Sequence, residues 1–264
     1  ISAGAPVPSG TVEKIRALCS PEAAFWTPYG ATECLPVAVI EGAQLQLTRV
    51  GTDQGFGTCI GWPLPENTVR LIRISDDLIE RWDDQWLVPV GEIGELTVAG
   101  PSVTESYIAR EEANRMAKIH EVLADGIERT VHRMGDLAWQ DAQGRLWFCG
   151  RKSQRLQTLQ GLLGTENVEP VFNLHPAVSR SALVGLGASP LQKPVLCIER
   201  TPGNDMTEQQ LFADLLAMAR THRHTQHIDT FLIHPGFPVD IRHNAKIGRE
   251  QLAVWAAERL GNGA

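Results

Sequence analysis

The stretch that decides the fold is Met134-Gly135-Asp136-Leu137-Ala138-Trp139-Gln140-Asp141-Ala142-Gln143-Gly144-Arg145-Leu146-Trp147-Phe148-Cys149-Gly150-Arg151. Four of its residues, Asp141-Ala142-Gln143-Gly144, separate two apolar segments. An Asp at the start and a Gly at the end of four residues suit a type I turn. The stretch therefore predicts a β-hairpin, with residues 134–137 and 146–149 in its two strands.

The residues before this hairpin are rich in Gly, Pro and Trp, with short β-type runs between turns. A helix is expected over 11–18, after Pro8-Ser9 and before Pro21. Residues 23–26 read as a buried strand, and Glu111 to Leu123 as a charged helix. Further strands are expected over 45–50, 69–74 and 95–98.

After Gly150 short helices and strands begin to alternate. The apolar residues of Glu208 to Ala219 lie on one stripe at helical spacing. Other helices are expected over 166–173 and 249–260, and strands over 155–160, 181–185, 195–199 and 228–233. The chain thus divides into a β-rich part, 1–150, and a small α+β domain, 151–264, with a hinge near 151–154.

Composition excludes several classes of function. The 264 residues include 24 Lys and Arg against 31 Asp and Glu, a formal net charge of −7, so a nucleic-acid surface is not expected. No run approaches the roughly 20 apolar residues that span a bilayer. The five cysteines form no C-x-x-C pair and are read as reduced, buried groups in a cytoplasmic protein.

Common catalytic motifs are also missing. The sequence has no phosphate loop of the G-x-x-x-x-G-K type, no G-x-G-x-x-G, no H-E-x-x-H and no G-x-S-x-G. His222, His224 and His227 invite a metal interpretation. Their spacing matches no common site and no carboxylate or Cys cluster joins them, so a solvated helix end or loop is the preferred interpretation.

The pentapeptide Tyr29-Gly30-Ala31-Thr32-Glu33 is of a kind suited to a nucleotide. Gly30 lets the backbone turn sharply, Thr32 offers a hydroxyl, and Glu33 offers a hard oxygen of the kind that Mg²⁺ prefers. Taken alone, the pentapeptide is a weak signal, and an ordinary turn at the end of a strand is the preferred interpretation.

This pentapeptide is the first of five segments that occur in a fixed order. The others are Gly91-Glu92-Ile93-Gly94-Glu95-Leu96, Met134-Gly135-Asp136-Leu137, Gly144 to Arg151, and His243-Asn244-Ala245-Lys246-Ile247-Gly248-Arg249. Together they resemble the acyl-adenylate-forming superfamily, which includes acyl-CoA synthetases, adenylation domains and luciferases. The resemblance covers essentially the whole chain but only the C-terminal half of a family member.

The resemblance implies a fold. The chain would hold the C-terminal part of the large AMP-binding domain, which is β-rich with a distorted β-barrel subdomain, followed by a small α+β lid. The sequences of residues 135–153 and 237–247 resemble those of one branch of the superfamily, the olefin-pathway β-lactone synthetases. That branch implies a ligase that uses ATP and Mg²⁺ to adenylate a long-chain β-hydroxy acid and closes it to a β-lactone, next to other enzymes of a hydrocarbon pathway.

The resemblance also implies roles for single residues. Gly4, Ala5 and Pro6 would lie along the adenine, with Tyr29 against the base and Gly30 beside it. Thr32 would contact phosphate, Glu33 would hold Mg²⁺, and Asp136 and Arg151 would bind the ribose hydroxyls. Lys246 would carry the first chemical step, because an ammonium offsets the repulsion between a carboxylate and the α-phosphate. Each of these residues also has a non-functional interpretation. Asp136 would be a turn residue, Arg151 would form a surface salt bridge, and Lys246 would be an ordinary surface lysine.

Two positions depart from the family pattern. Ser153 stands where relatives usually have the Asp or Lys of the hinge, and Ala245 stands where they commonly have Gly before the lysine. The family's Ser/Thr/Gly-rich phosphate loop has no counterpart in this sequence, so the isolated chain is expected to be inactive. A long-chain fatty-acid–CoA ligase and a non-catalytic binding module remain as alternatives. His132, His234 and His243 remain open as acceptors of the substrate's hydroxyl proton.

Overall fold

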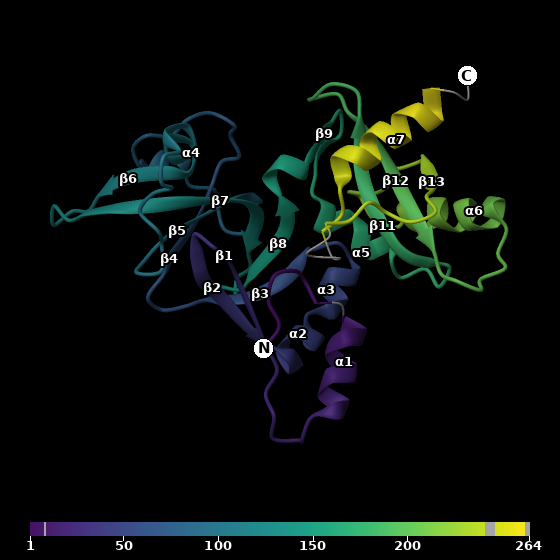
Figure 1. Ribbon diagram of the computed structural model, residues 1–264, viewed down its shortest axis with the longest axis horizontal. Helices are drawn as coiled ribbons and strands as arrows, with labels where there is room; N and C mark the ends of the chain where they lie inside the picture. Colours follow the sequence, from purple (N-terminus) through teal and green to yellow (C-terminus); the bar gives the residue numbers. More distant parts are fainter. Residues whose placement is uncertain (8, 241–245, 262–264) are drawn as a thin grey trace. The chain divides into compact units, whose positions relative to one another are not determined.

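The computed structural model describes residues 1–7, 9–240 and 246–261 (Figure 1). The density of contacts divides the chain into two units. The first unit holds Ile1–Arg49 and Thr58–Lys152, and the second holds Val50–Gly57 and Ser153–Ala264. The predicted movement of one domain as a lid over the other stays a prediction.

The first unit is built on an antiparallel eight-stranded sheet with the order β1-β2-β3-β8-β7-β5-β4, and β6 pairs with β7. Its strands are β1 (Trp26–Ala31), β2 (Cys34–Glu41), β3 (Thr58–Pro63), β4 (Thr68–Ile72), β5 (Gly94–Ala99), β6 (Lys118–Val122), β7 (Glu128–Gln140) and β8 (Leu146–Arg151). Its helices are α1 (Ser9–Leu18), α2 (Gly42–Leu47), η1 (Asp84–Trp86) and α4 (Glu111–Ala117), while α3 (Arg49–Asp53) crosses into the second unit.

The predicted hairpin is the pairing of β7 with β8. Trp139 lies opposite Trp147, and their rings stack with centroids 5.6 Å apart. The turn closes as expected, because the amide of Gly144 donates to the carbonyl of Asp141 at 2.9 Å. The side chain of Asp141 also accepts hydrogen bonds from the amide of Arg145 and the indole of Trp147, so this acidic residue holds both the turn and the strand after it.

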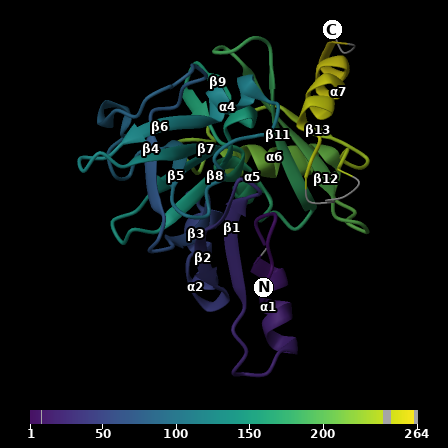
Figure 2. The same ribbon diagram turned by 60° about the vertical axis from the view of Figure 1, so that its left-hand side comes forward.

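The second unit is a three-stranded sheet between two layers of helices (Figures 1 and 2). Side chains of β11 and β12 alternate: Leu183 and Leu196 pack with α5 and α6, whereas Val184 and Val195 pack with α7. This is the period of two that a strand buried on both faces requires. The elements are η2 (Lys152–Gln154), β9 (Leu156–Thr158), β10 (Gly161–Leu163), α5 (Thr165–Phe172), β11 (Val178–Leu186), β12 (Lys193–Arg200), α6 (Glu208–Ala219), β13 (Phe231–Ile233) and α7 (Arg249–Gly261).

Some of the local predictions are wrong. The strand expected over 45–50 is helical, because the side chain of Glu41 caps the amide of Ala43 at 2.7 Å and starts α2 there. The helix expected over 111–123 ends at Ala117, after which β6 pairs with β7 in alternation. The first β strand begins only at Trp26, and Ala23 and Ala24 before it are exposed.

The predicted burial of cysteine is right at four positions and wrong at one. Cys34, Cys59, Cys149 and Cys197 are buried free thiols, whereas Cys19 is exposed just after α1. Among the described residues, no helix has the length and hydropathy needed to cross a membrane.

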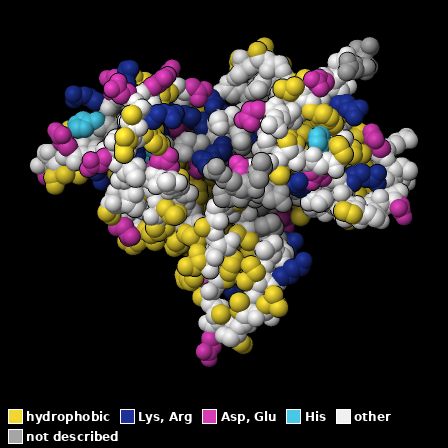
Figure 3. All heavy atoms as spheres, viewed as in Figure 1, with side chains coloured by type: hydrophobic (Ala, Val, Ile, Leu, Met, Phe, Trp, Pro, Cys, Tyr) yellow, Lys and Arg dark blue, Asp and Glu magenta, His cyan; other side chains and the backbone are white. Residues whose placement is uncertain are grey.

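Apolar side chains gather on the surface of the first unit where α1 and α2 lie, in the lower part of the view (Figure 3). Leu18 is 88% exposed and Leu47 is 82% exposed. Single exposed apolar residues are common on protein surfaces. A face on which several gather is a feature typical of interaction surfaces.

Candidate functional site

The centre of the candidate site is Asp136, a buried carboxylate on β7. It stands opposite Arg151 in the register of β7 and β8, and Nη1 of Arg151 lies 2.9 Å from its Oδ1. Tyr29 on β1 donates a hydrogen bond of 2.5 Å to the other oxygen, Oδ2. The structure therefore brings together three of the residues predicted to bind the nucleotide, from strands that are far apart in the sequence.

Glycines shape the backbone at both partners of this pair. Gly135 has φ of 66° and Gly150 has φ of 117°, in the region that side chains disfavour. Each glycine directly precedes one member of the pair, Asp136 or Arg151. The two strands are thus bent locally, with Gly150 opposite Leu137 in the ladder, where the charged side chains meet.

Burial and charge act on Asp136 in opposite directions. Burial raises the pKa of this carboxyl group, while the Arg151 guanidinium and the hydrogen bond from Tyr29 lower it, and the net result is a raised pKa. Burial, together with the neighbouring Asp136 carboxylate, also raises the pKa of Tyr29 well above its ordinary value, so the phenol keeps its proton and remains a donor.

One oxygen of Asp136 can accept a further hydrogen bond. Its Oδ1 is buried and accepts no hydrogen bond from the described residues, because the contact with Arg151 is an ion pair without hydrogen-bond alignment. A buried acceptor without a donor is unfavourable in a finished core, and at a binding site it is a place for a ligand's donor. Arg151 itself is half exposed, so the pair opens to solvent on one side.

Glu33 lies in the turn between β1 and β2. Its Oε1 accepts a hydrogen bond of 2.8 Å from the hydroxyl of Tyr107, and its carbonyl accepts one from the amide of Thr104. Burial by itself would raise the pKa of Glu33, but the hydrogen bond from Tyr107 and the charge of Lys118 lower it, with a net lowering. These contacts thus favour the ionised form of Glu33.

The remaining predicted residues of the first unit are less enclosed. Thr32 is exposed in the same turn as Glu33, and Gly30 is half-buried on β1. Gly4, Ala5 and Pro6 are exposed in the segment after Ser2, whose amide donates to the carbonyl of Trp26 at the start of β1. The described contacts place this segment beside β1 but show no adenine-binding contact.

Lys246 belongs to the second unit, whereas Asp136 and Arg151 belong to the first. It is exposed, and its carbonyl accepts a hydrogen bond of 2.9 Å from the amide of Asp240. Val239 and Ile247 form an antiparallel bridge, so the backbone that follows Lys246 is held in place. Ala245 and His243 lie outside the described residues.

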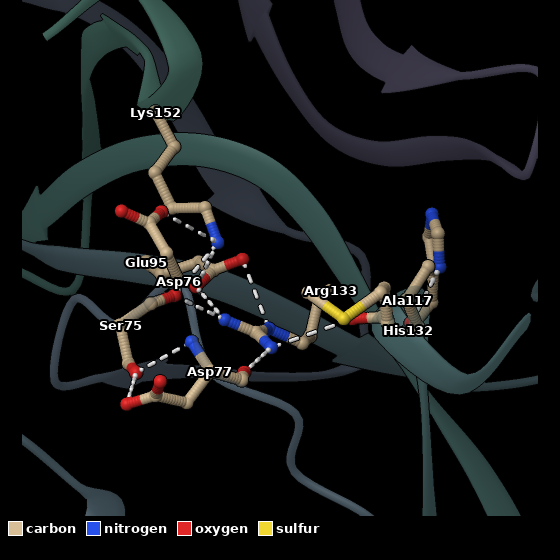
Figure 4. A network of polar contacts seen from close by, with 9 residues as sticks. Ser75, Asp76, Asp77, Glu95, Ala117, His132, Arg133 and Lys152 are labelled. Carbon is tan, nitrogen blue, oxygen red and sulfur yellow. Dashed lines mark hydrogen bonds and ion pairs between the residues drawn. The ribbon is translucent and has the colours of Figure 1, made fainter. Parts of the chain in front are cut away.

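The residues next to Arg151 and near Asp136 in the sequence take part in a buried ionic network that sequence reasoning missed (Figure 4). Glu95 on β5 receives a two-pronged contact from Arg133 on β7, at 3.1 and 2.6 Å, and a third contact from Nζ of Lys152 at 3.0 Å. Arg133 and Lys152 also donate to the carbonyl of Ser75. Lys152 directly follows Arg151, and Arg133 precedes Asp136 by three residues, so the network fixes the backbone of both.

The sequence indicated only part of this network. The segment Gly94-Glu95-Leu96 was singled out by its resemblance, but nothing in the sequence indicated that Glu95 would be buried between two cations. Tyr107 gave no signal at all, because its contact with Glu33 joins residues 74 positions apart.

Comparison with known proteins shows which proteins the chain is similar to. Residues 1–108 match the family model described as AMP-binding enzyme. The amide bond synthetase McbA from Marinactinospora thermotolerans superposes with a TM-score of 0.70 at 22% identity, over 96% of this chain and 45% of that one. O-succinylbenzoate CoA synthetase from Bacillus subtilis in complex with AMP gives 0.67 at 20% identity, over 96% and 46%. The chain thus matches the AMP-binding enzymes over its first 108 residues, and it has the fold of adenylate-forming enzymes.

Within this family two relatives are much more similar. The chain is 56% identical over 262 residues to the olefin β-lactone synthetase of Xanthomonas campestris pv. campestris, and 56% identical over 261 residues to that of Stenotrophomonas maltophilia. Each match covers 98% of this chain and 47% of the relative. A long-chain-fatty-acid–CoA ligase of Yersinia pestis is 31% identical over 186 residues. The chain spans about half the length of the β-lactone synthetases that it matches.

Proposed function

We propose that this chain forms about half of an ATP-dependent ligase that adenylates a long-chain β-hydroxy fatty acid and closes it to a β-lactone. The observation that carries the proposal is the buried Asp136 paired with Arg151, with one carboxylate oxygen left without a hydrogen-bond donor. The similarity at 56% identity to two olefin β-lactone synthetases supports the substrate class.

The chemistry of Asp136 fits a ribose. A ribose offers two neighbouring hydroxyl donors, and an ionised carboxylate has two oxygens that each accept more than one hydrogen bond. Tyr29 occupies one position on Oδ2, and Oδ1 is open to a donor. Arg151 keeps the carboxylate charged and supplies N–H donors of its own to the nucleotide.

Glu33 fits the role of an Mg²⁺ ligand in the form that this ion usually takes with nucleotides. Mg²⁺ is commonly bound by one or two carboxylates together with substrate phosphates. Glu33 is half-buried and is held ionised by its neighbours. The ion would neutralise charge on the phosphates of ATP. Among the described residues no group of three or more His, Cys, Asp or Glu side chains is placed to hold a metal.

The first step joins two anions. A carboxylate oxygen of the fatty acid attacks the α-phosphorus of ATP, the bond to the leaving pyrophosphate breaks, and an acyl-adenylate forms. Lys246 would place an ammonium beside the attacking carboxylate and the α-phosphate, and so lower the energy of the charged transition state. Because Lys246 stands on the second unit, closure of that unit as a lid would bring the charge to the nucleotide.

In the second step the substrate's own β-hydroxyl oxygen attacks the activated carbonyl carbon. The four-membered lactone closes, AMP leaves, and the hydroxyl proton passes to a base. The step is intramolecular, so the nucleophile has a high effective concentration without an external acceptor. His132 is poorly suited as the base, because it is 3% exposed and burial, with the nearby charge of Lys118, lowers its pKa to about 4.

The second candidate is a long-chain fatty-acid–CoA ligase, in which a CoA thiol takes the acyl group from the adenylate. The similarity to the ligase of Yersinia pestis favours this alternative, at a lower identity of 31%. Other enzymes of a long-chain hydrocarbon pathway are the proposed partners of the β-lactone synthetase, and the cytoplasm is its proposed compartment. Five free cysteines agree with a reducing compartment.

A chimera tests the proposal. This chain replaces the matching half of the Xanthomonas campestris relative, and the product formed from a β-hydroxy acid and ATP is identified by mass spectrometry. We expect a β-lactone, AMP and pyrophosphate, with no thioester when CoA is added. A thioester would favour the CoA ligase, and an inactive chimera of unchanged fold would favour the non-catalytic module. The isolated chain is expected to release no pyrophosphate.

Two variants of the chimera connect the activity to the site. Asp136→Asn keeps the shape of the side chain but removes its charge, and is expected to raise the KM for ATP about tenfold or more, the loss of one charged hydrogen bond. Lys246→Ala is expected to lower the rate of adenylation by about a hundredfold or more without changing AMP binding. Activity unchanged in both variants would contradict the proposed roles.

A further inference from the structure

The second unit contains a pocket that the proposed function does not use. It has a volume of about 670 Å³ and opens between the β9–β10 hairpin and the segment that follows α6. The hairpin contributes Thr158 and Gln160, and the segment after α6 contributes Arg223, His224 and His227. All of these residues belong to the second unit, whereas Asp136 belongs to the first.

The charge of this pocket is opposite to that of the chain. The protein carries a net charge of −7, yet no acidic side chain lines the pocket. Arg223 makes no ion pair or hydrogen bond through its guanidinium with any residue in the described part of the chain. An unpaired guanidinium facing a pocket without carboxylates is a site for an anionic group.

The histidines of the pocket are arranged for hydrogen bonding and not for a metal. Nε2 of His224 lies 2.8 Å from the carbonyl oxygen of Asn167, so this nitrogen carries a hydrogen and is not available as a ligand. Burial lowers the pKa of His224, which keeps its ring neutral. The rings of His222 and His224 lie against each other with centroids 5.6 Å apart. No metal-binding group of three was found among the described residues.

The other wall of the pocket is apolar. Leu163 and Pro194 are buried beneath it, and Leu162 is half exposed at its edge. A phosphate ion occupies about as much space as a few water molecules, each of about 30 Å³. The volume of the pocket is several times larger than that. The pocket therefore offers polar donors at one side and room for an organic group at the other.

We propose that this pocket binds a phosphate monoester, with the phosphate at Arg223 and the organic group against Leu162 and Pro194. Arg223 provides a planar fork of donors that matches two phosphate oxygens. Gln160 lines the same pocket, and its side-chain amide provides further donors, whereas the hydroxyl of Thr158 already donates to the carbonyl of Gly161. The proposal is independent of nucleotide binding at Asp136, because none of the residues on which it depends belongs to the first unit.

The test uses the 264-residue chain and follows the imidazole signals of His224 and His227 by NMR. Inorganic phosphate and butyl phosphate are added separately near neutral pH. We expect a saturable shift of both signals, with butyl phosphate binding several-fold more tightly than inorganic phosphate. Arg223→Gln is expected to weaken butyl phosphate binding about tenfold or more. The matched control Arg220→Gln removes the same charge from an exposed position outside the pocket and should change the affinity little.

Several results would overturn the proposal. The first is the absence of saturable shifts with either probe, and the second is equal weakening by Arg220→Gln and Arg223→Gln, which would indicate attraction to charge in general. Equal affinity for the two probes would contradict the role of the apolar wall. Shifts with Zn²⁺ but not with phosphate would favour a metal site. Because Arg223 is exposed, its variant is expected to fold, and circular dichroism checks this.

Discussion

The phenol hydroxyl of Tyr29 donates a hydrogen bond of 2.5 Å to the carboxylate of Asp136, a residue 107 positions further along the chain. Their strands, β1 and β7, are separated in the sheet by β2, β3 and β8. The ring of Tyr29 packs against Phe148 of β8, with centroids 6.0 Å apart. The bond therefore forms only when the order of strands in the first unit is complete.

Tyr29→Phe removes this bond and nothing else of comparable size. Because the hydrogen bond lowers the pKa of Asp136, we expect the variant to raise that pKa further above its usual range. We also expect the free energy of unfolding to fall by about 1–2 kcal/mol, because a buried acceptor loses its donor. Carboxyl ¹³C NMR titration measures the first effect, and urea unfolding measures the second.

The chain offers a matched control, since it contains only two tyrosines. Tyr107→Phe also removes a phenol donor from a carboxylate, that of Glu33. This control should raise the pKa of Glu33, which the bond from Tyr107 now lowers, and leave that of Asp136 unchanged. An equal shift of Asp136 in both variants would show that the effect is not local.

Local sequence signals predicted most of the elements but not those whose conformation depends on partners. The turn at Asp141 and the helix from Glu208 to Ala219 were predicted, because both carry their own caps and spacing. The segment 118–122 was predicted as a helix, yet it is β6, since Glu121 is buried by ion pairs to Arg70 and Arg129 that no local pattern reveals.

The same distinction between local signals and dependence on partners applies to the residues of the candidate site. Asp136 and Arg151 were identified because their motifs resemble a family, and the structure places them in contact. The proposed roles of these residues remain predictions. Lys152 was not predicted to have a role, because a lysine gives no signal of its partner until the strands that carry Glu95 and Arg133 are side by side.

Lys152→Gln tests the buried network. Glu95 is 1% exposed, and loss of one cation leaves its carboxylate with Arg133 alone. We expect the free energy of unfolding to fall by about 2–4 kcal/mol, because removal of one partner from a buried ionic group leaves charge uncompensated. Arg115→Gln, at an ion pair whose partners are 66% and 68% exposed, should change it by less than about 0.5 kcal/mol. Equal effects would contradict the network's role.

Asp141→Asn tests the turn of the hairpin. The carboxylate accepts four hydrogen bonds, from the amides of Gln143 and Arg145, the guanidinium of Arg145 and the indole of Trp147. An amide side chain has one acceptor oxygen and cannot replace both carboxylate oxygens. We expect a loss of about 2–3 kcal/mol in the free energy of unfolding.

The pH dependence of the free energy of unfolding provides a second test of the Asp141→Asn variant. Burial would raise the pKa of Asp141, but the bonds from Trp147 and Arg145 lower it below its ordinary value. The stability that this group contributes is therefore present above the unfolded pKa near 3.8 and is lost as the pH falls through the lower folded pKa. Asp141→Asn should lose this part of the acid sensitivity. Asp125→Asn, in an exposed turn, is the control.

His132 is a buried histidine whose ring is held in one tautomer. It is 3% exposed, and its Nδ1 lies 3.1 Å from the carbonyl oxygen of Ala117, so Nδ1 carries the hydrogen (Figure 4). Burial, and then the charge of Lys118, lowers the pKa of His132 from 6.5 to about 4. The folded protein therefore keeps this ring neutral at pH values where the unfolded chain protonates it.

The free energy of unfolding should consequently depend on His132 between pH 6.5 and about 4. Above pH 6.5 neither state is protonated at this ring and the residue contributes no slope. Below it the unfolded state binds the proton first, so stability falls with falling pH, by about 3 kcal/mol across the window. His132→Asn retains a donor toward Ala117 but does not titrate, and its stability curve should lack this slope. Urea unfolding at a series of pH values measures the difference, with the exposed His227→Gln as a control that keeps the slope. Parallel curves for the wild type and His132→Asn would mean that His132 is protonated in the fold.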